Sequence, residues 1–548
     1  MTVQPELTDE QRSHRVEGAA RWLQDLCRGL LARLRQLVAR YRLAIDEPLL
    51  SAIAEEMRLR RSADPAIPGQ VYERLLAGDR RGRRAGGGYY TPAHLVDLVV
   101  ERTLGPHTGR IDQLRVLDPA CGGGAFLLGA LRRGVPERCL VGVDRDARAL
   151  EVCRLGLLLA GAGQTRLLRA DSLRDDAGGE AEFDVVLGNP PWGQKGFRFP
   201  PEEAAYLRSR YHSAVGVLDP FKLFVERALE LVRPGGHWGM VLPDIVLLKD
   251  QRAIRDLMLE RSALEWIVHA GRAFPGVNLD AAVIIGRREA HVPSDHRVSV
   301  WHRLPEDWAE RPPRTRRIAQ RVFGELSGHK LNIYLTQRSL RLLRKLSGIP
   351  RLGQLFEAHE GVHTGNARAK LFLDHRVGQH TVKVIVGRDE LAPFTLRWRG
   401  TWLNRDPECL DRAAGDYANL GRPEWFEQAK IVVRRTGDRV IAAYDTQGYY
   451  CSNNLFVVLP LKSMPERMLL GCVAFLNSRF TTWYFRTVQP RVGRLFAELK
   501  IQHLVDFPLP AGVESLADLR GGGLDNAVSE LLGLSQSERA MVARCHRA

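Results

Sequence analysis

The sequence predicts a doubly wound α/β domain with a mostly parallel sheet, preceded by a helical segment and followed by a mixed α+β domain. Three observations predict this architecture. Between residues 89 and 290, short and continuously apolar runs alternate with amphipathic stretches, a pattern typical of parallel strands covered on both faces. Before them, apolar residues recur at helical three- and four-residue steps. After residue 350, short strands alternate with many turns.

The chain has 548 residues and is too long for one core, since domains usually contain about 100–200 residues. Shifts in composition predict five segments. They are an N-terminal helical segment (1–85), the parallel-sheet domain (86–290), a polar connector rich in Arg and Pro (291–345), the second domain (346–515) and a helical tail (516–548).

Charge and composition narrow the function classes. Lys and Arg total 80 against 64 Asp and Glu, a net charge of +16, which favours a polyanionic partner such as nucleic acid. No run approaches the ~18 apolar residues of a membrane span, and the first residues do not resemble a secretory leader. A cytoplasmic protein without a membrane partner is therefore expected. The eight cysteines form no C-x-x-C pair, so reduced thiols are expected and no metal site.

The N-terminal segment is predicted to be helical throughout. Apolar positions from Arg15 to Leu43 follow an amphipathic pattern, and shorter helices end at 71–78. A basic run at 79–84 then leads into the glycines 86–88, which predict a flexible joint. A helical cap is favoured over a module dedicated to binding a partner.

Seven apolar runs are predicted as the strands of the parallel-sheet domain. They are residues 115–120, 139–144, 166–171, 183–189, 237–243, 264–270 and 281–286. Ligands of such sheets bind at the carboxyl ends of the strands. The loops that follow the strands are therefore where functional residues are expected.

Acidic residues end the first three strands. Asp118 opens a glycine-rich corner whose backbone can approach a ligand closely. Asp144 stands where an acid can accept hydrogen bonds from two ribose hydroxyls, and Asp171-Ser172 is placed to meet an adenine amine. Three acids would repel a pyrophosphate. They favour S-adenosylmethionine over NAD as the cofactor.

The fourth strand ends in Asn189-Pro190-Pro191-Trp192. The two prolines remove backbone donors and make the turn rigid, so that the Asn189 amide oxygen and nearby carbonyls can accept hydrogen bonds from an exocyclic amine. Trp192 offers a flat face on which a base can stack, worth about 1–3 kcal/mol. The pattern predicts a site that binds and activates an amine.

These motifs resemble those of the gamma-class N6-adenine DNA methyltransferases. The similar stretches, in chain order, are GYYTP (88–92), DPACGGGAF (118–126), VGVD (141–144), ADSL (170–173), NPPW (189–192), DPFKLF (219–224), RPGGHWGMVLP (233–243) and GRAFPGVNLDAAVIIGRR (271–288). Further stretches between 352 and 542 are similar to the TaqI-type C-terminal specificity domain. The resemblance implies a Rossmann-like methyltransferase fold and a DNA target-recognition domain. It covers most of the chain from about residue 70.

Roles for single residues follow from this resemblance. The residues implied to bind S-adenosylmethionine are Thr91, Pro92, Asp118, Pro119, Ala120, Cys121, Gly122, Asp144, Asp171, Ser172 and Phe224. The implied catalytic residues are Asn189, Pro190, Pro191 and Trp192, and Trp192 and Phe274 would sandwich an adenine rotated out of the duplex. In the second domain, the DNA-contact candidates are Thr364, Gly365, Asn366, Lys430, Arg434 and Arg435. Trp192 departs from the Tyr or Phe that many members carry.

The expected function is site-specific methylation of adenine N6 in double-stranded DNA, in restriction–modification or phage defence, without a metal. Two alternatives stay open. The chain could be a methyltransferase subunit that needs a separate nuclease or defence partner, for which the N-terminal helices are the expected docking site. It could also methylate an amine or amide of RNA or protein, which the large second domain disfavours. The recognition sequence cannot be derived from these residues.

Overall fold

The computed structural model describes residues 29–78, 90–174, 182–193, 199–274, 279–387, 389–490 and 497–544. The predicted basic run and glycine joint at 79–88 lie outside these residues. The chain divides into two compact units, Met1–Ile333 and Tyr334–Ala548. No helix of the described residues has both the length and the apolar character that crossing a membrane requires.

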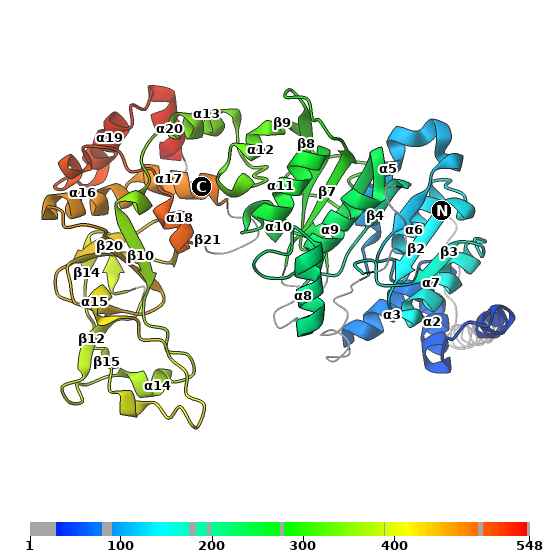
Figure 1. The fold of residues 1–548 in the computed structure, drawn as a ribbon, viewed down its shortest axis with the longest axis horizontal. Coiled ribbons are helices and arrows are strands. Elements are labelled where there is room, and N and C mark those ends of the chain that lie inside the picture. The colour runs from blue at the N-terminus through cyan, green and yellow to red at the C-terminus, as the bar shows by residue number, and fades with distance from the viewer. Residues whose placement is uncertain are drawn as a thin grey trace, which may run out of the picture. The chain divides into compact units, whose positions relative to one another are not determined.

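In the first unit, the described residues form a nine-stranded sheet in the order β3-β2-β1-β4-β5-β7-β6-β8-β9 (Figure 1). The strands are β1 (Val116–Asp118), β2 (Leu140–Asp144), β3 (Arg166–Arg169), β4 (Phe183–Gly188), β5 (Val232–Pro243), β6 (Ser262–Gly271), β7 (Ala281–Arg288), β8 (Arg297–Trp301) and β9 (Arg316–Ala319). The first five in this order run parallel, and β7 enters antiparallel between β5 and β6. The seven predicted strands are confirmed, with small shifts at their ends.

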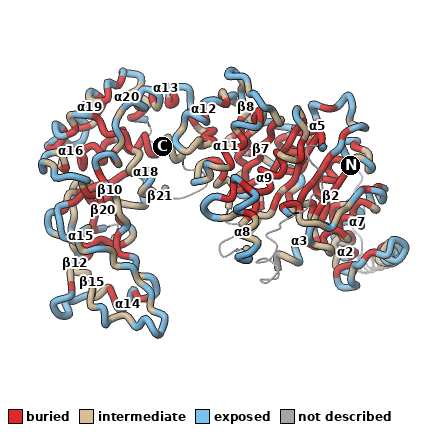
Figure 2. The backbone as a smooth tube through the Cα atoms, viewed as in Figure 1, coloured by how far each residue is buried: buried red, intermediate tan, exposed pale blue. Residues whose placement is uncertain are grey.

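Helices cover both faces of this sheet (Figure 1). They are α5 (Ala93–Leu104), α6 (Ala125–Arg132), α7 (Ala147–Leu159), α8 (Pro201–Arg210), α9 (Pro220–Leu231), α10 (Ile245–Leu248), α11 (Arg252–Arg261) and α12 (Arg321–Gly324). The central strands are buried along nearly their whole length, which Figure 2 shows as continuous red. Strands enclosed in this way must be apolar on both faces, which is why the continuous apolar runs predicted them.

The N-terminal helical segment packs on the sheet domain. Residues 29–41 are helical, followed by α2 (Glu47–Leu59) and α3 (Ile67–Gly78). Their apolar faces share one core with the outer face of α7, including Ile53, Val71 and Leu155. From residue 29 onward the predicted helices are therefore present, and they belong to the first unit; the predicted helical pattern before residue 29 lies outside the described residues.

The predicted connector at 291–345 is wrong, because its first part completes the sheet. β8 pairs with β6, and β9 pairs with β8. The guanidinium of Arg102 on α5 lies 4.4 Å from the Trp266 ring centroid and within 6 Å of those of Trp301 and Trp308. These cation–π contacts join residues that are distant in sequence. The local composition, polar and rich in Arg, therefore gave no sign that this segment belongs to the sheet.

In the second unit, the described strands form two four-stranded sheets. The first has the order β10-β20-β16-β18 and the second β11-β15-β12-β19. The strands are β10 (Phe356–Glu360), β20 (Leu455–Pro460), β16 (Lys430–Arg434), β18 (Ala442–Asp445), β11 (Phe372–Leu373), β15 (Trp402–Asn404), β12 (Thr381–Ile385) and β19 (Tyr450–Cys451). Shorter pairs are β13 (Leu391–Ala392) with β14 (Thr395–Leu396) and β17 (Thr436–Gly437) with β21 (Ala497–Glu498).

The first of these sheets lies between two cores. Successive side chains of a strand point to opposite faces. Ile431 and Val433 of β16 therefore join a core with the surrounding helices, whereas Val432 joins a core with the second sheet. The helices around the first core are α13 (Gln337–Lys345), α16 (Glu466–Leu476), α17 (Arg479–Val488), α18 (Ile501–Val505), α19 (Gly521–Leu531) and α20 (Gln536–Arg544), and the short helices α14 (Arg368–Leu371) and α15 (Pro423–Phe426) contribute Leu371 and Phe426 to the second.

The predicted helical tail at 516–548 does not form a separate segment. Leu524 and Val528 of α19 and Val542 of α20 belong to the same helix-lined core as β16. The predicted α+β architecture of the second domain is confirmed, with the tail as part of it.

Candidate functional site

A cavity opens at the carboxyl ends of β1, β2, β3 and β4, where the sequence predicted a ligand. The sequence-predicted residues that line it are Thr91, Asp118, Pro119, Ala120, Cys121, Gly122, Asp144, Asp171, Ser172, Asn189, Pro190, Pro191, Trp192, Phe224 and Phe274. Pro92 is not among the lining residues and instead forms the N-cap of α5. One cavity therefore brings together nearly all of the predicted site.

The acids at the strand ends are held by backbone donors. The Gly122 N–H donates to Asp144 Oδ2 at 2.9 Å, and the Asp146 N–H donates to Asp144 Oδ1 at 2.8 Å. The Ala120 N–H donates to Asp118 Oδ1 at 3.1 Å. Burial raises the pKa of Asp118 to about 8 and raises that of Asp144 as well, because desolvation disfavours the charged form. A cationic or donor-rich ligand would relieve this cost.

Asn189 is oriented by Thr91, which lies just before α5. Its Nδ2 donates to Thr91 Oγ1 at 3.0 Å. Its Oδ1 is buried and has no hydrogen-bond partner among the described residues. A buried acceptor without a partner is uncommon, because desolvating it costs about 1–3 kcal/mol. The amide is thus fixed with its oxygen available to a donor on a ligand.

The two aromatic residues predicted to sandwich a base contact each other. The ring centroids of Trp192 and Phe274 are 5.1 Å apart, and the planes meet at 80°. This edge-to-face arrangement leaves no space for a third ring between them. Stacking on both rings therefore requires Phe274 to move away from Trp192.

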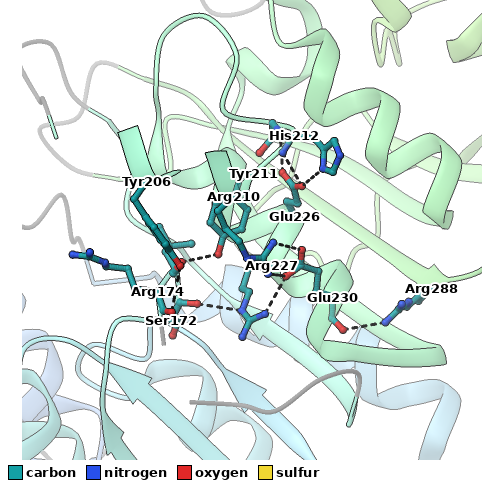
Figure 3. A network of polar contacts seen from close by, with 12 residues as sticks. Ser172, Arg174, Tyr206, Arg210, Tyr211, His212, Glu226, Arg227, Glu230 and Arg288 are labelled. Carbon is teal, nitrogen blue, oxygen red and sulfur yellow. Dashed lines mark hydrogen bonds and ion pairs between the residues drawn. The ribbon is translucent and has the colours of Figure 1, made fainter. Parts of the chain in front are cut away.

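A network of charged side chains braces the loop after β3 (Figure 3). Arg227 on α9 is buried and donates to the Ser172 carbonyl oxygen at 3.2 Å and to Glu230 at 3.0 Å. The Tyr211 hydroxyl donates to the Leu173 carbonyl oxygen at 2.9 Å. Ser172 itself, predicted to contact the cofactor, donates from Oγ to the Pro119 carbonyl oxygen at 2.6 Å. It joins two loops that line the cavity.

Glu73 is a cavity residue that the site prediction missed. It extends from α3 into the cavity, and its Oε2 is buried without a hydrogen-bond partner among the described residues. Burial and the nearby Asp144 raise its pKa to about 7. The signal available in the sequence was its place in PGQVYERLL (68–76), a helical stretch shortly before GYYTP.

α3 packs close to the cavity because two glycines, Gly69 on α3 and Gly123 after β1, let the two backbones approach each other. A Cβ on Gly69 would lie 2.7 Å from the Gly123 carbonyl oxygen, and one on Gly123 would lie 2.5 Å from the Gly69 Cα. The neighbouring Tyr72 hydroxyl donates to Asp146 at 2.6 Å. The glycine corner after β1 therefore accommodates a helix as well as a ligand.

The DNA-contact candidates of the second unit divide into two groups. Gly365 and Asn366 are exposed and Thr364 is half-buried, in a loop that Asn366 ties to residues 415–417. Arg434 donates to the Leu391 carbonyl oxygen, and Arg435 pairs with Glu360 and Glu498. Each half-buried arginine therefore already bonds within the unit.

Lys430 is a wrong prediction. Its side chain is fully buried and forms an ion pair with Asp445 on the neighbouring strand, and it also donates to the Phe426 carbonyl oxygen. A lysine held in this way cannot reach DNA. Its position as the first residue of an apolar strand was the signal for burial.

One group of possible metal ligands occurs in the described residues. Atoms of Asp244, His269 and Asp280 lie within 4.8 Å of one another at the ends of β5, β6 and β7. His269 Nε2 and Asp280 Oδ2 are 3.4 Å apart, a contact that needs no cation between the two side chains. This group carries no functional assignment.

Comparison with known protein families finds a match in each of the two units. Residues 63–303 match the family N-6 DNA Methylase, and residues 382–509 match the TaqI-like C-terminal specificity domain. The chain combines an N-6 DNA methylase domain with a TaqI-like specificity domain. The predicted resemblance is therefore confirmed, and the cavity at the strand ends lies in the methylase domain.

Two relatives are named as methyltransferases. The Type II methyltransferase M.TthHB8I of Thermus thermophilus is 24% identical over 428 residues, which cover 74% of this chain and 87% of the relative. The Type II methyltransferase M.VspI of Vibrio sp. (strain 343) is 23% identical over 282 residues, 51% of this chain and 64% of the relative. The chain thus spans just under two thirds of the Vibrio protein.

Solved structures share the fold of the N-6 DNA methylase and specificity domains. The Type IIL restriction-modification enzyme MmeI in complex with DNA is 14% identical, with a TM-score of 0.58 over 88% of this chain and 81% of that one. A DrdV–DNA complex is 12% identical, with a TM-score of 0.54 over 86% of this chain and 59% of that one. The predicted fold class is confirmed.

Proposed function

We propose that this chain transfers the methyl group of S-adenosylmethionine to the N6 amine of an adenine in double-stranded DNA, at a site that the second unit recognises. The single observation that carries the proposal is the buried Asn189 Oδ1, which has no hydrogen-bond partner among the described residues. Thr91 holds the amide so that this oxygen faces a ligand. An exocyclic amine is the donor that such an acceptor fits.

The residues of the cavity fit S-adenosylmethionine. Asp144, Asp171 and Glu73 present carboxylates to a ligand rich in donors, and Phe224 and the Pro119–Cys121 corner add apolar contacts. Bound there, S-adenosylmethionine would supply an electrophilic methyl group on its sulfonium. The raised pKa values of Asp118 and Glu73 suit a cationic cofactor better than a phosphate.

Catalysis on this proposal is positioning and electrostatic stabilisation. Asn189 Oδ1 and the Pro190 carbonyl oxygen accept the two amine hydrogens and stabilise the positive charge that develops on the nitrogen. Pro190 and Pro191 lack the N–H groups that would compete for these acceptors. Trp192 stacks on the base after it leaves the duplex, which offsets part of the unstacking cost of a few kcal/mol.

The experiment that tests the function uses cells that express this chain alone. Their genomic DNA is analysed by single-molecule sequencing for modified bases. Methyladenine at one short sequence supports the proposal and gives the target. Asn189→Ala should abolish this modification while the purified protein still binds S-adenosylmethionine, and loss of cofactor binding would contradict the role given to Asn189.

One outcome of this test points to a partner. If the purified wild-type protein binds S-adenosylmethionine but no DNA is modified, then either a partner subunit is missing or the substrate is another amine. Repeating the assay with genes neighbouring the coding sequence separates these two readings. Relatives named as Type I methylase subunits make a partner-dependent form the second candidate function.

A further inference from the structure

An apolar projection stands in the loop between α8 and α9. Val217 is 83% exposed, more than any other large apolar side chain among the described residues, and Val215 is 65% exposed. Single exposed apolar residues are common on protein surfaces. Here two exposed valines lie in one short loop on either side of Gly216, which has a φ of +67°. They form a tip whose side chains both point into solvent.

The backbone of this tip is held unusually firmly. The four consecutive carbonyl oxygens of residues 214–217 each accept a hydrogen bond from a cationic side chain. Arg208 donates to the first and third at 2.8 and 3.0 Å, and Lys222 donates to the second and fourth at 2.9 and 2.6 Å. Lys222 is only 3% exposed. Hydrogen bonds to charged groups are the stronger ones, so this loop resists deformation.

The start of the loop is fixed by a buried carboxylate. The N–H groups of His212 and Ser213 donate to Glu226 at 3.0 and 2.8 Å. Glu226 is 1% exposed, and burying a charge is costly unless it is bonded. The fold therefore uses two buried charged residues, Glu226 and Lys222, to hold a loop whose two valines are exposed and join no core.

The far end of the loop connects directly to the site. Asp219 caps α9 and accepts a hydrogen bond from the Gly193 N–H at 2.8 Å. Gly193 follows Trp192, and Pro220 after Asp219 lines the cavity. The apolar tip thus stands two residues from the residue that holds the Asn-Pro-Pro-Trp loop in place.

We infer that Val217, with Val215 beside it, inserts into the base stack of the duplex and occupies the space left when the target adenine rotates into the cavity. This inference rests on the proposed function. Proteins that unstack DNA insert apolar side chains between base steps, and a wedge must be rigid to keep its place there. A protein partner is disfavoured, because two valines supply far less than the ~1,000 Å² of a stable protein interface.

The positive charge around the tip suits the same partner. Arg208 on α8 is exposed beside the loop and carries its charge there while it donates to the loop carbonyl oxygens. Arg210 on the same helix is paired with Glu230, so the exposed charge beside the tip comes from Arg208. Contacts of such a charge with phosphate fix orientation without reading sequence.

The test compares Val217→Ser with Leu59→Ser, a control on α2 whose side chain is as exposed as that of Val215, at 65%. Once the target sequence is mapped, duplexes carry 2-aminopurine at the target position, and its fluorescence rises when the base leaves the stack. Val217→Ser should lower the flipped fraction of the 2-aminopurine duplex, and the methylation rate of the matching duplex with adenine at the target, by about tenfold, the ratio that corresponds to burying one valine side chain. Leu59→Ser should match the wild type.

A second substrate separates the wedge from other roles. In a duplex with an abasic site opposite the target, the adenine has no pairing partner and needs no wedge, so Val217→Ser should methylate this duplex at close to the wild-type rate. An equal deficit on both duplexes would overturn the inference, as would weaker S-adenosylmethionine binding by the variant. Failure of the wild type to methylate any DNA, also in the presence of products of the neighbouring genes, would refute the proposed function instead, which keeps the two failures distinct.

Discussion

Glu73→Gln gives a pH-dependent prediction for cofactor binding. Glu73 lies in the cavity with an unpartnered buried oxygen and a pKa of about 7. Its charged fraction therefore rises from about a tenth at about pH 6 to about nine tenths at about pH 8. If the ionised carboxylate binds a donor group of cationic S-adenosylmethionine, affinity should rise about tenfold over this range, equal to about 1.4 kcal/mol.

The glutamine variant keeps the size of the side chain but cannot ionise. The part of the rise in S-adenosylmethionine affinity that comes from Glu73 should therefore be absent in this variant. The assay is isothermal titration of S-adenosylmethionine at a series of pH values, with wild type, Glu73→Gln and Glu203→Gln compared. Glu203 is half-buried and lines the same cavity, and its variant should keep the wild-type slope. Asp118 also has a pKa of about 8 and contributes to the pH dependence of every variant. The quantity to compare is therefore the difference between the affinity–pH curves of the wild type and Glu73→Gln. Parallel curves for Glu73→Gln and wild type would refute the reasoning.

The same groups make a prediction for stability without cofactor. The pKa values of Glu73 and Asp118 are raised in the folded state, to about 7 and about 8. Protonated carboxyls therefore favour folding at low pH, and this contribution is lost as the pH rises through 7 and 8. The melting temperature of cofactor-free protein should fall between about pH 5 and about pH 8, and less so in Glu73→Gln.

Two further predictions concern packing. Gly69→Ala should destabilise the first unit by about 1–3 kcal/mol and weaken cofactor binding, because its Cβ meets the Gly123 backbone. Calorimetry would show this against Gly29→Ala, which meets nothing within 4 Å and should be neutral. Lys430→Met should cost about 3–5 kcal/mol in urea unfolding, because it leaves Asp445 buried without its partner. A variant that unfolds normally but loses only DNA binding would restore Lys430 as a DNA contact.

The strands of the methylase domain were predictable because burial on both faces imposes a local pattern. A run such as Phe183–Gly188 is buried at every position, and no other environment requires an apolar side chain at each step. The Asn189 loop was predictable for a similar reason, since its two prolines restrict the backbone locally. In both cases the information lies within a few consecutive residues.

The errors arose where the deciding contact is distant in sequence. β8 and β9 are short and lie among arginines and prolines, and their place in the sheet depends on pairing with β6 and on the tryptophans around Arg102. Lys430 looked like a surface cation beside Arg434, but its partner Asp445 lies on another strand. Glu73 was missed because its exposure to the cavity depends on the close approach of α3 to the glycine corner.

The double-sided sheet of the second unit has an evolutionary consequence. Val432 and Val457 face one core, while Ile431 and Val458 face the other, so a single sheet isolates the helical layer from the outer sheet. Substitutions in the outer layer and its loops can accumulate without disturbing the packing of the helices. The unit is therefore built so that changes at its outer surface leave the helical scaffold, and with it the ability to fold, intact.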